Sequence, residues 1–294
     1  MIKILLKEKK VLLAAALAML LPILFTLITG KPENQVTKLL SAIPCEILLV
    51  IAIGYLCYTM GFKNVGLRKP KYLKLFYLIP ELLLIFIIIT TMIKVPSVAY
   101  SNTVILKLLV LAMLVGIYEE LLSRGLVLHL FARGKSPIIA IVCSGLFFGF
   151  LHISNFQGTN GIETYFQVVE TIAAGIYGAV LTLTLRSIVP LMITHFLYDF
   201  FLFISLYFTS LEPVAKSTAA QASIFSFSAY IMPLMYLFIA GVVYLIERKN
   251  IRNYVSEISD GLKNESSNYK KFSPFLTVLI TTAFIFLLTF IRIQ

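Results

Sequence analysis

The sequence predicts an all-α fold, a polytopic bundle of about eight or nine transmembrane helices around a polar intramembrane chamber. The 294 residues are 59% hydrophobic and 13% charged, with a mean hydropathy of +0.93, which is too apolar for a soluble domain of this size. Apolar runs near the roughly 20 residues that a spanning helix needs recur along the chain. A few of these runs contain acidic, basic and imidazole side chains, and these groups predict the chamber.

The expected spans follow the apolar runs in order. They lie near 11–29, 39–60, 72–93, 103–131, 136–152, 165–186, 188–208, 228–246 and 273–291. Basic residues precede the first run, but the run itself is about 19 residues long, which exceeds the apolar region of an ordinary signal peptide. We therefore expect a retained signal anchor there.

Charge patterning predicts the orientation of the bundle. The formal net charge is +11, and most of the 25 Lys and Arg residues fall in alternate loops, on the side that includes the N-terminus. The positive-inside rule places that side in the cytoplasm. The charge thus indicates a plasma membrane and its anionic lipids, not a nucleic acid, as the partner. Cys45, Cys57 and Cys143 all lie in apolar segments, which favours neither disulfides nor a sulfur-rich metal site.

The first polar motif lies late in the fourth expected span. Glu120 and Arg124 are four residues apart, so they share a helix face and can pair, whereas Glu119 is rotated about 100° away. Taken alone, this pattern fits a structural ion pair as well as it fits chemistry. A proton acceptor must have a pKa suited to neutral pH, and apolar burial moves a carboxylate in that direction. Glu119 is therefore the candidate base, with Arg124 holding Glu120 charged.

Two further motifs lie in the fifth and seventh spans. His152 ends the fifth span, one turn after Phe148, and His195 and Asp199 repeat the spacing of four residues. A single histidine at a helix end is commonly interfacial, and a His–Asp pair can be structural, but two of the chain's three histidines fall in this pattern. The third, His129, is expected at the cytoplasmic interface.

Together the motifs resemble a known family. The order Glu-Glu-x-x-x-Arg, Phe-x-x-x-His and His-x-x-x-Asn/Asp resembles the CPBP intramembrane proteases, which include type II CAAX prenyl endopeptidases and bacterial relatives linked to bacteriocin processing and self-immunity. The resemblance covers roughly 105–205. It implies that Glu119 and His152 activate water, that His195 and Asp199 bind the oxyanion or a metal, and that Arg124 holds Glu120. On this basis we divide the chain into N-terminal helices at 1–104, a catalytic core at 105–208 and C-terminal helices at 209–294, with a polar linker at 247–271.

One position departs from the family pattern. The family often has asparagine where this chain has Asp199, and an ionised aspartate repels an oxyanion. Asp199 would therefore have to be protonated, orient His195 or ligate a cation. His-Glu-x-x-His is absent, but a divalent metal such as zinc held by residues among Glu119, His152, His195 and Asp199 stays open beside metal-free catalysis.

Three classes of function remain open from the sequence. The first is an endopeptidase that cuts a membrane-associated protein or peptide, in keeping with a bacterial plasma membrane. The second is a non-enzymatic scaffold or bacteriocin-immunity protein that uses the same polar cluster structurally, and a more distant third is an ion or proton transporter. The remaining acidic residues in apolar stretches, Glu46, Glu81 and Glu170, favour structural pairing over a substrate entrance. Gly175 and Gly178 are expected to permit close helix packing.

Overall fold

The computed structural model describes residues 35–60, 65–92, 101–153, 161–210 and 231–263, and every regular element in these ranges is a helix. Within these ranges, three helical stretches are long and apolar enough to cross a membrane, namely Tyr72–Thr90, Thr164–Leu185 and Val189–Phe208, and Ile43–Tyr58 and Pro137–Leu151 are shorter apolar helices. The all-α, multi-pass prediction is confirmed. The expected spans 11–29 and 273–291 lie outside the described residues, so a total of eight or nine spans stays a prediction.

The elements follow the apolar runs of the sequence closely. The N-terminal part holds α2 (Gln35–Ser41), α3 (Ile43–Met60), the 3₁₀ helix η2 (Tyr72–Leu78) and α4 (Ile79–Met92). The central part holds α5 (Asn102–Glu120), the π-helical η3 (Leu121–Leu128), α6 (His129–Ala132), α7 (Pro137–Leu151), α8 (Gly161–Leu185) and α9 (Val189–Ser210). Helix α11 (Met232–Lys263) follows. Ser136 begins α7 as its N-cap, accepting a hydrogen bond from the Ile139 amide, and Pro137 fits the first turn.

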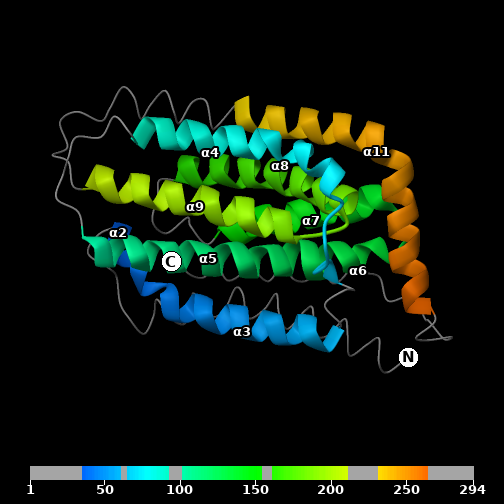
Figure 1. Cartoon of the computed structure of the whole chain (residues 1–294), viewed down its shortest axis with the longest axis horizontal. Helices are drawn as coiled ribbons and strands as arrows, with labels where there is room; N and C mark the ends of the chain where they lie inside the picture. The colour runs from blue at the N-terminus through cyan, green and yellow to red at the C-terminus, as the bar shows by residue number, and fades with distance from the viewer. Residues whose placement is uncertain (1–34, 61–64, 93–100, 154–160, 211–230, 264–294) are drawn as a thin grey trace.

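The long helices run side by side along the longest axis of the molecule (Figure 1). Helix α5 packs against α3 and α9, α9 packs against α4, and α8 packs against α7 and α11. Helices α5, η3 and α6 continue one another without a break, so a single helical stretch carries the first polar motif through the bundle. This arrangement brings the parts of the chain that hold the three motifs together.

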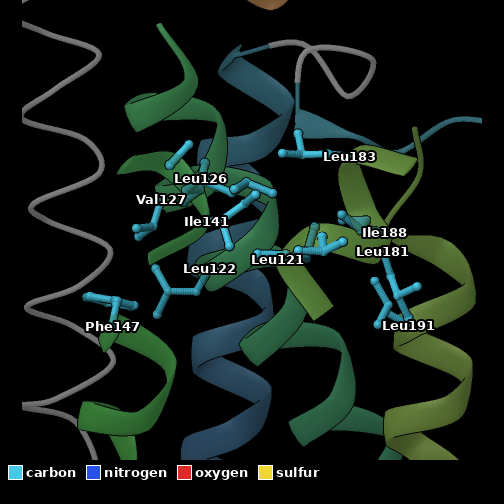
Figure 2. Packing of buried hydrophobic residues seen from close by; sticks show 14 of the residues in the cluster. Leu121, Leu122, Leu126, Val127, Ile141, Phe147, Leu181, Leu183, Ile188 and Leu191 are labelled. Carbon is cyan, nitrogen blue, oxygen red and sulfur yellow. The ribbon is translucent and has the colours of Figure 1, made fainter. Parts of the chain in front are cut away.

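Aliphatic side chains pack around η3, which gives the first motif a rigid setting. Leu122, Leu126 and Leu128 are fully buried. Figure 2 shows the leucines of η3 among side chains of α7, α8 and α9, including Ile141 and Leu181. A close-packed interior of this kind resists displacement, so it can hold buried polar groups in one geometry.

Helices α7 and α8 approach each other closely at glycines. A Cβ added at Gly145 would lie 2.8 Å from the backbone nitrogen of Ile176, and one at Gly175 would lie 2.8 Å from the Cα of Gly145. Gly149 meets Ile172 in the same way. Such contacts between small residues are the usual means of helix association in membranes. The close packing that the sequence predicted is therefore present at Gly175.

Helix α11 differs from the sequence prediction. It runs alongside the bundle and then turns across the ends of the other helices (Figure 1). The polar linker expected at 247–271 is helical as far as Lys263. The reason is that Ile251, Tyr254 and Val255 are buried on one face of this polar stretch, which has the spacing of an amphipathic helix.

We call the region where α11 crosses the helix ends the polar end. Arg186 pairs with Glu257 at 2.7 Å, Lys135 pairs with Asp260 at 3.4 Å, and Lys74 pairs with Glu247. The ring of Tyr254 lies below the guanidinium groups of Arg68 and Arg186, at 4.7 and 5.0 Å. These contacts attach α11 to the rest of the described bundle.

Candidate active site

The first motif lies where α5 gives way to η3. Glu119 is 7% exposed, and Glu120 and Arg124 are each 2% exposed, so all three are buried. Arg124 Nη1 donates a hydrogen bond to Glu120 Oε1 over 2.7 Å. The π-helical turns that begin at Leu121 are a local geometry that is frequent at functional sites. The predicted pair of Glu120 with Arg124 is therefore formed, and Glu119 points to different partners.

His195 on α9 joins the two glutamates. Its Nδ1 lies 3.0 Å from Glu120 Oε1, and its Nε2 lies 3.8 Å from Glu119 Oε2. On the same helix, Asp199 Oδ2 lies 3.4 Å from Nε2. Ionised carboxylates only accept hydrogen bonds, so a ring protonated on both nitrogens can donate to the groups on either side. Five of the six residues chosen from sequence thus form one cluster.

His152 reaches the cluster through an aromatic side chain. The ring of Phe148 lies 5.2 Å from the ring of His152 and 5.8 Å from the ring of His195, between centroids. The guanidinium of Arg124 lies 3.9 Å above the same Phe148 ring, a distance typical of a cation–π contact. His152 Nδ1 is 3.0 Å from the carbonyl oxygen of Phe148, one turn earlier. Phe148 therefore places all three motifs around one aromatic ring.

Two glycines let the helices approach the charged cluster. A Cβ at Gly178 would lie 2.8 Å from Arg124 Nη2, so α8 leaves room for the guanidinium at this position. A Cβ at Gly116 would lie 3.0 Å from the backbone nitrogen of Phe196, which brings α5 against α9 beside His195. Gly178 was expected from sequence to serve helix packing, and its neighbour is in fact the arginine of the first motif.

Further acidic groups border the cluster. Glu46 on α3 is 8% exposed and interacts electrostatically with Glu119 and Asp199. Glu81 on α4 interacts with His195, Glu120 and Arg124. Glu81 also accepts a hydrogen bond from the Tyr236 hydroxyl over 3.5 Å, in keeping with the structural pairing that the sequence favoured. Carboxylates thus predominate in and around the residues of the three motifs, which we call the polar cluster, with Arg124 and His195 as the basic groups that contact them.

Sequence reasoning missed Tyr118. Its hydroxyl donates a hydrogen bond to Glu119 Oε1 over 3.0 Å, and the side chain is buried. Nothing in the spacing marks this residue, because a neighbour in sequence normally points to a different face of the helix. His129 also differs from expectation. It is 3% exposed, with Nδ1 at 2.7 Å from the Arg124 carbonyl oxygen and Nε2 at 3.4 Å from the Tyr254 hydroxyl, so it links the first motif to the polar end.

The donor groups do not assemble into a metal site in the described ranges. No three His, Cys, Asp or Glu side chains in this part of the chain form a group that could hold a metal ion. His195 Nδ1 contacts Glu120 Oε1. His152 Nδ1 contacts the carbonyl oxygen of Phe148 and not a carboxylate. The residues present therefore do not fit the zinc site that was left open from sequence.

Comparison with known proteins finds one match. Residues 101–201 match the family model described as type II CAAX prenyl endopeptidase Rce1-like. This part of the chain is therefore similar to a family of membrane proteases. No curated protein and no solved structure matches the chain.

The matched region, as we call residues 101–201, holds all three polar motifs. It runs from the start of α5 into α9 and contains Glu119, Glu120 and Arg124 together with His152, His195 and Asp199. Helix α3, which carries Glu46, and helix α4, which carries Glu81, lie outside it. Two acidic groups that border the polar cluster thus come from segments that the family match does not cover.

Proposed function

We propose that the protein is an intramembrane endopeptidase that hydrolyses a peptide bond in a membrane-associated protein or peptide. The observation that carries the proposal is the position of Glu119. Its Oε2 is buried, has no hydrogen-bond partner among the described residues, and faces His195 Nε2 at 3.8 Å. A carboxylate oxygen held without a partner beside an imidazole is suited to bind and deprotonate a water molecule.

The proposed reaction uses Glu119 as general base. The water oxygen attacks the carbonyl carbon of the peptide, one water proton passes to Glu119 Oε2, and the carbonyl electron pair moves onto oxygen. When the tetrahedral intermediate collapses, the C–N bond breaks, and the leaving nitrogen takes up the proton from Glu119. The products are a new carboxylate and a new amine.

His195 is proposed to stabilise the oxyanion, because its ring lies next to the base and can donate from Nε2. Asp199 Oδ2 lies 3.4 Å from the same nitrogen of the ring, and of the roles open for this residue we propose that it orients His195. Arg124 fixes Glu120, and Glu120 in turn holds His195 Nδ1. His152, behind Phe148, is proposed to assist Glu119 with the water proton.

The orientation in the membrane is proposed from the charges. The basic side chains of Arg68, Lys74, Lys135 and Arg186 contact α11 at the polar end, where Ser259 of α11 also donates to the carbonyl oxygen of Arg133. We place this end and the N-terminus in the cytoplasm of a bacterial plasma membrane. Single cysteines introduced at exposed Lys135 and Asp260 should react with a membrane-impermeant thiol reagent only after the cytoplasmic face is opened.

The test of the proposed function compares membrane proteins from cells that express the wild-type chain or Glu119→Gln. New protein N- and C-termini are identified by mass spectrometry. The proposal predicts matched pairs of termini, from one cleaved bond each, with the wild type and their loss in the variant. Identical termini in both samples would overturn it. A CAAX-type prenylated peptide added to the purified wild type and Glu119→Gln proteins then shows whether the substrate is prenylated.

A second function is supported by one observation. Arg124, Glu120 and His195 bind one another, as structural groups in a scaffold or an immunity protein would. In that case no new termini appear, and Glu119→Gln changes only thermal stability or partner binding. A chelator added to the purified protein addresses metal chemistry, since a metal-dependent protease would lose activity and recover it with zinc.

A further inference from the structure

Tyr118 stands directly beside the proposed base and belongs to none of the three motifs. It is 9% exposed, and its hydroxyl donates to Glu119 Oε1 over 3.0 Å. The two residues are neighbours in the last turn of α5, just before the π-helical η3 begins. The tyrosine is therefore placed to act on the carboxylate from its own helix, on the side away from His195.

The hydrogen bond makes the two oxygens of Glu119 different. Oε1 accepts from Tyr118, whereas Oε2 is buried without a hydrogen-bond partner in the described ranges and lies 3.8 Å from His195 Nε2. A carboxylate with two equivalent free oxygens could turn about its own axis. With Oε1 held, Oε2 is the oxygen that remains directed at His195.

Packing keeps the tyrosine itself in place. Its ring belongs to the same buried apolar cluster as Cys45 and Leu49 of α3, and α3 packs along α5. The hydroxyl also interacts electrostatically with Glu46, so the groups around it are acidic. The phenol is the donor and the carboxylate oxygen the acceptor in the hydrogen bond to Glu119.

We propose that Tyr118 is a positioning residue, which holds Oε1 of Glu119 so that Oε2 takes the proton from the attacking water. This inference rests on the proposed function. Its role is to orient the base and not to contact the substrate, so removing the hydroxyl should slow the chemical step and leave substrate binding unchanged.

The experiment measures initial rates for Tyr118→Phe in liposomes. The substrate is a synthetic peptide that spans a cleavage site found by the terminus comparison above. We expect kcat to fall by about 10- to 100-fold, because misplacing a catalytic group by about 1 Å can cost 10²-fold, while KM changes less than about twofold. The matched control is Tyr207→Phe. Tyr207 is also buried, and its hydroxyl accepts a hydrogen bond from the Ser101 amide over 3.0 Å, away from the cluster.

The outcomes separate the two proposals. A wild-type rate in Tyr118→Phe, while Glu119→Gln is inactive, overturns the positioning role and leaves the protease in place. An equal loss in Tyr118→Phe and Tyr207→Phe also overturns it, because the effect would then be general destabilisation. If the wild type does not cleave any membrane protein, the proposed function fails and this inference fails with it.

A second variant covers the case in which Tyr118→Phe does not fold. Replacement of Tyr118 by 4-fluorophenylalanine keeps the ring and fills the place of the hydroxyl with fluorine, which cannot donate a hydrogen bond to Glu119 Oε1. We therefore expect kcat to fall as for Tyr118→Phe while KM stays the same. An unchanged kcat would contradict the proposal.

Discussion

The two ends of the helical stretch from Tyr118 to His129 both carry buried polar groups, but the groups are partnered differently. In the polar cluster, Glu119, Glu120 and Asp199 surround His195, and Oε2 of each of the two glutamates has no hydrogen-bond partner among the described residues. At the polar end, acids and bases are matched in pairs such as Arg186 with Glu257. Burial alone therefore does not distinguish a reactive site from a structural one. Arg124 holds Glu120, whereas Oε2 of Glu119 faces His195 Nε2 without a hydrogen bond, and the predictions below test that difference.

The largest expected effects come from changing the two adjacent glutamates of the polar cluster, Glu119 and Glu120, which should respond differently. Glu119→Gln should lower the cleavage rate by about 10²–10⁴-fold, the usual contribution of a general base, with little change in melting temperature. Glu120→Gln should instead destabilise the protein by about 3–5 kcal/mol, because it leaves the buried Arg124 without a charged partner. Initial rates and thermal unfolding in detergent check both variants. Equal stability losses in the two would contradict the distinction.

Gly178→Ala should also disturb the polar cluster, because it displaces Arg124. The new Cβ would lie 2.8 Å from Arg124 Nη2, and the flexible side chain would move away from Glu120. We expect kcat to fall by about tenfold or more, since small misplacements near the reacting groups are costly. The matched control is Gly241→Ala in α11, where nothing lies within 4 Å of the added Cβ. It should leave the rate unchanged and stabilise the helix by up to about 1 kcal/mol.

Tyr254→Phe should affect the polar end alone. The variant keeps the ring beneath Arg68 and Arg186 but loses the hydroxyl that accepts from Arg68 and contacts His129. The expected loss is about 1 kcal/mol of unfolding free energy, seen as a lower melting temperature with kcat unchanged. A fall in kcat at unchanged stability would instead show that the polar end influences the catalytic residues of the polar cluster through His129.

The smallest effect is a pH dependence at the polar end. Burial would raise the pKa of Glu247, but hydrogen bonds from Lys74, Asn250 and Tyr77 outweigh it and hold this pKa below its ordinary value. A carboxylate with a lowered folded-state pKa stabilises the protein above its unfolded pKa, and this stability is lost as pH falls through the folded value. Melting temperatures from about pH 6 down to about pH 3 should therefore drop less steeply for Glu247→Gln than for the wild type. Parallel curves would contradict the assignment.

Much of the described fold could be predicted from apolar runs, because each lipid-crossing helix needs a continuous one. The second half of α11 could not be recognised as easily. Its exposed charges hide a buried face of Ile251, Tyr254 and Val255, which a search for helical periodicity would have found. The contacts of α11 across the helix ends depend on tertiary packing and have no signature in the sequence.

The candidate site was predictable where spacing decides geometry. The i, i+4 pairs Glu120–Arg124 and His195–Asp199 form as the helix period requires. Tyr118 could not be predicted, because its bond to the next residue depends on side-chain rotamers. The contact of His152 with the cluster through Phe148 could not be predicted either, because it depends on how α7 packs against η3 and α9.

Glu119 is proposed to activate the water molecule that attacks the peptide bond, and isotopic labelling of the products is the most direct test of this role. Membranes that contain the wild-type protein or Glu119→Gln are incubated in H₂¹⁸O, and new C-termini are analysed by mass spectrometry. With the wild type, we expect new C-terminal carboxylates that each carry one ¹⁸O atom. With Glu119→Gln, we expect these termini to be absent. Labelled termini of equal abundance in the two samples, or new termini without ¹⁸O, would contradict it.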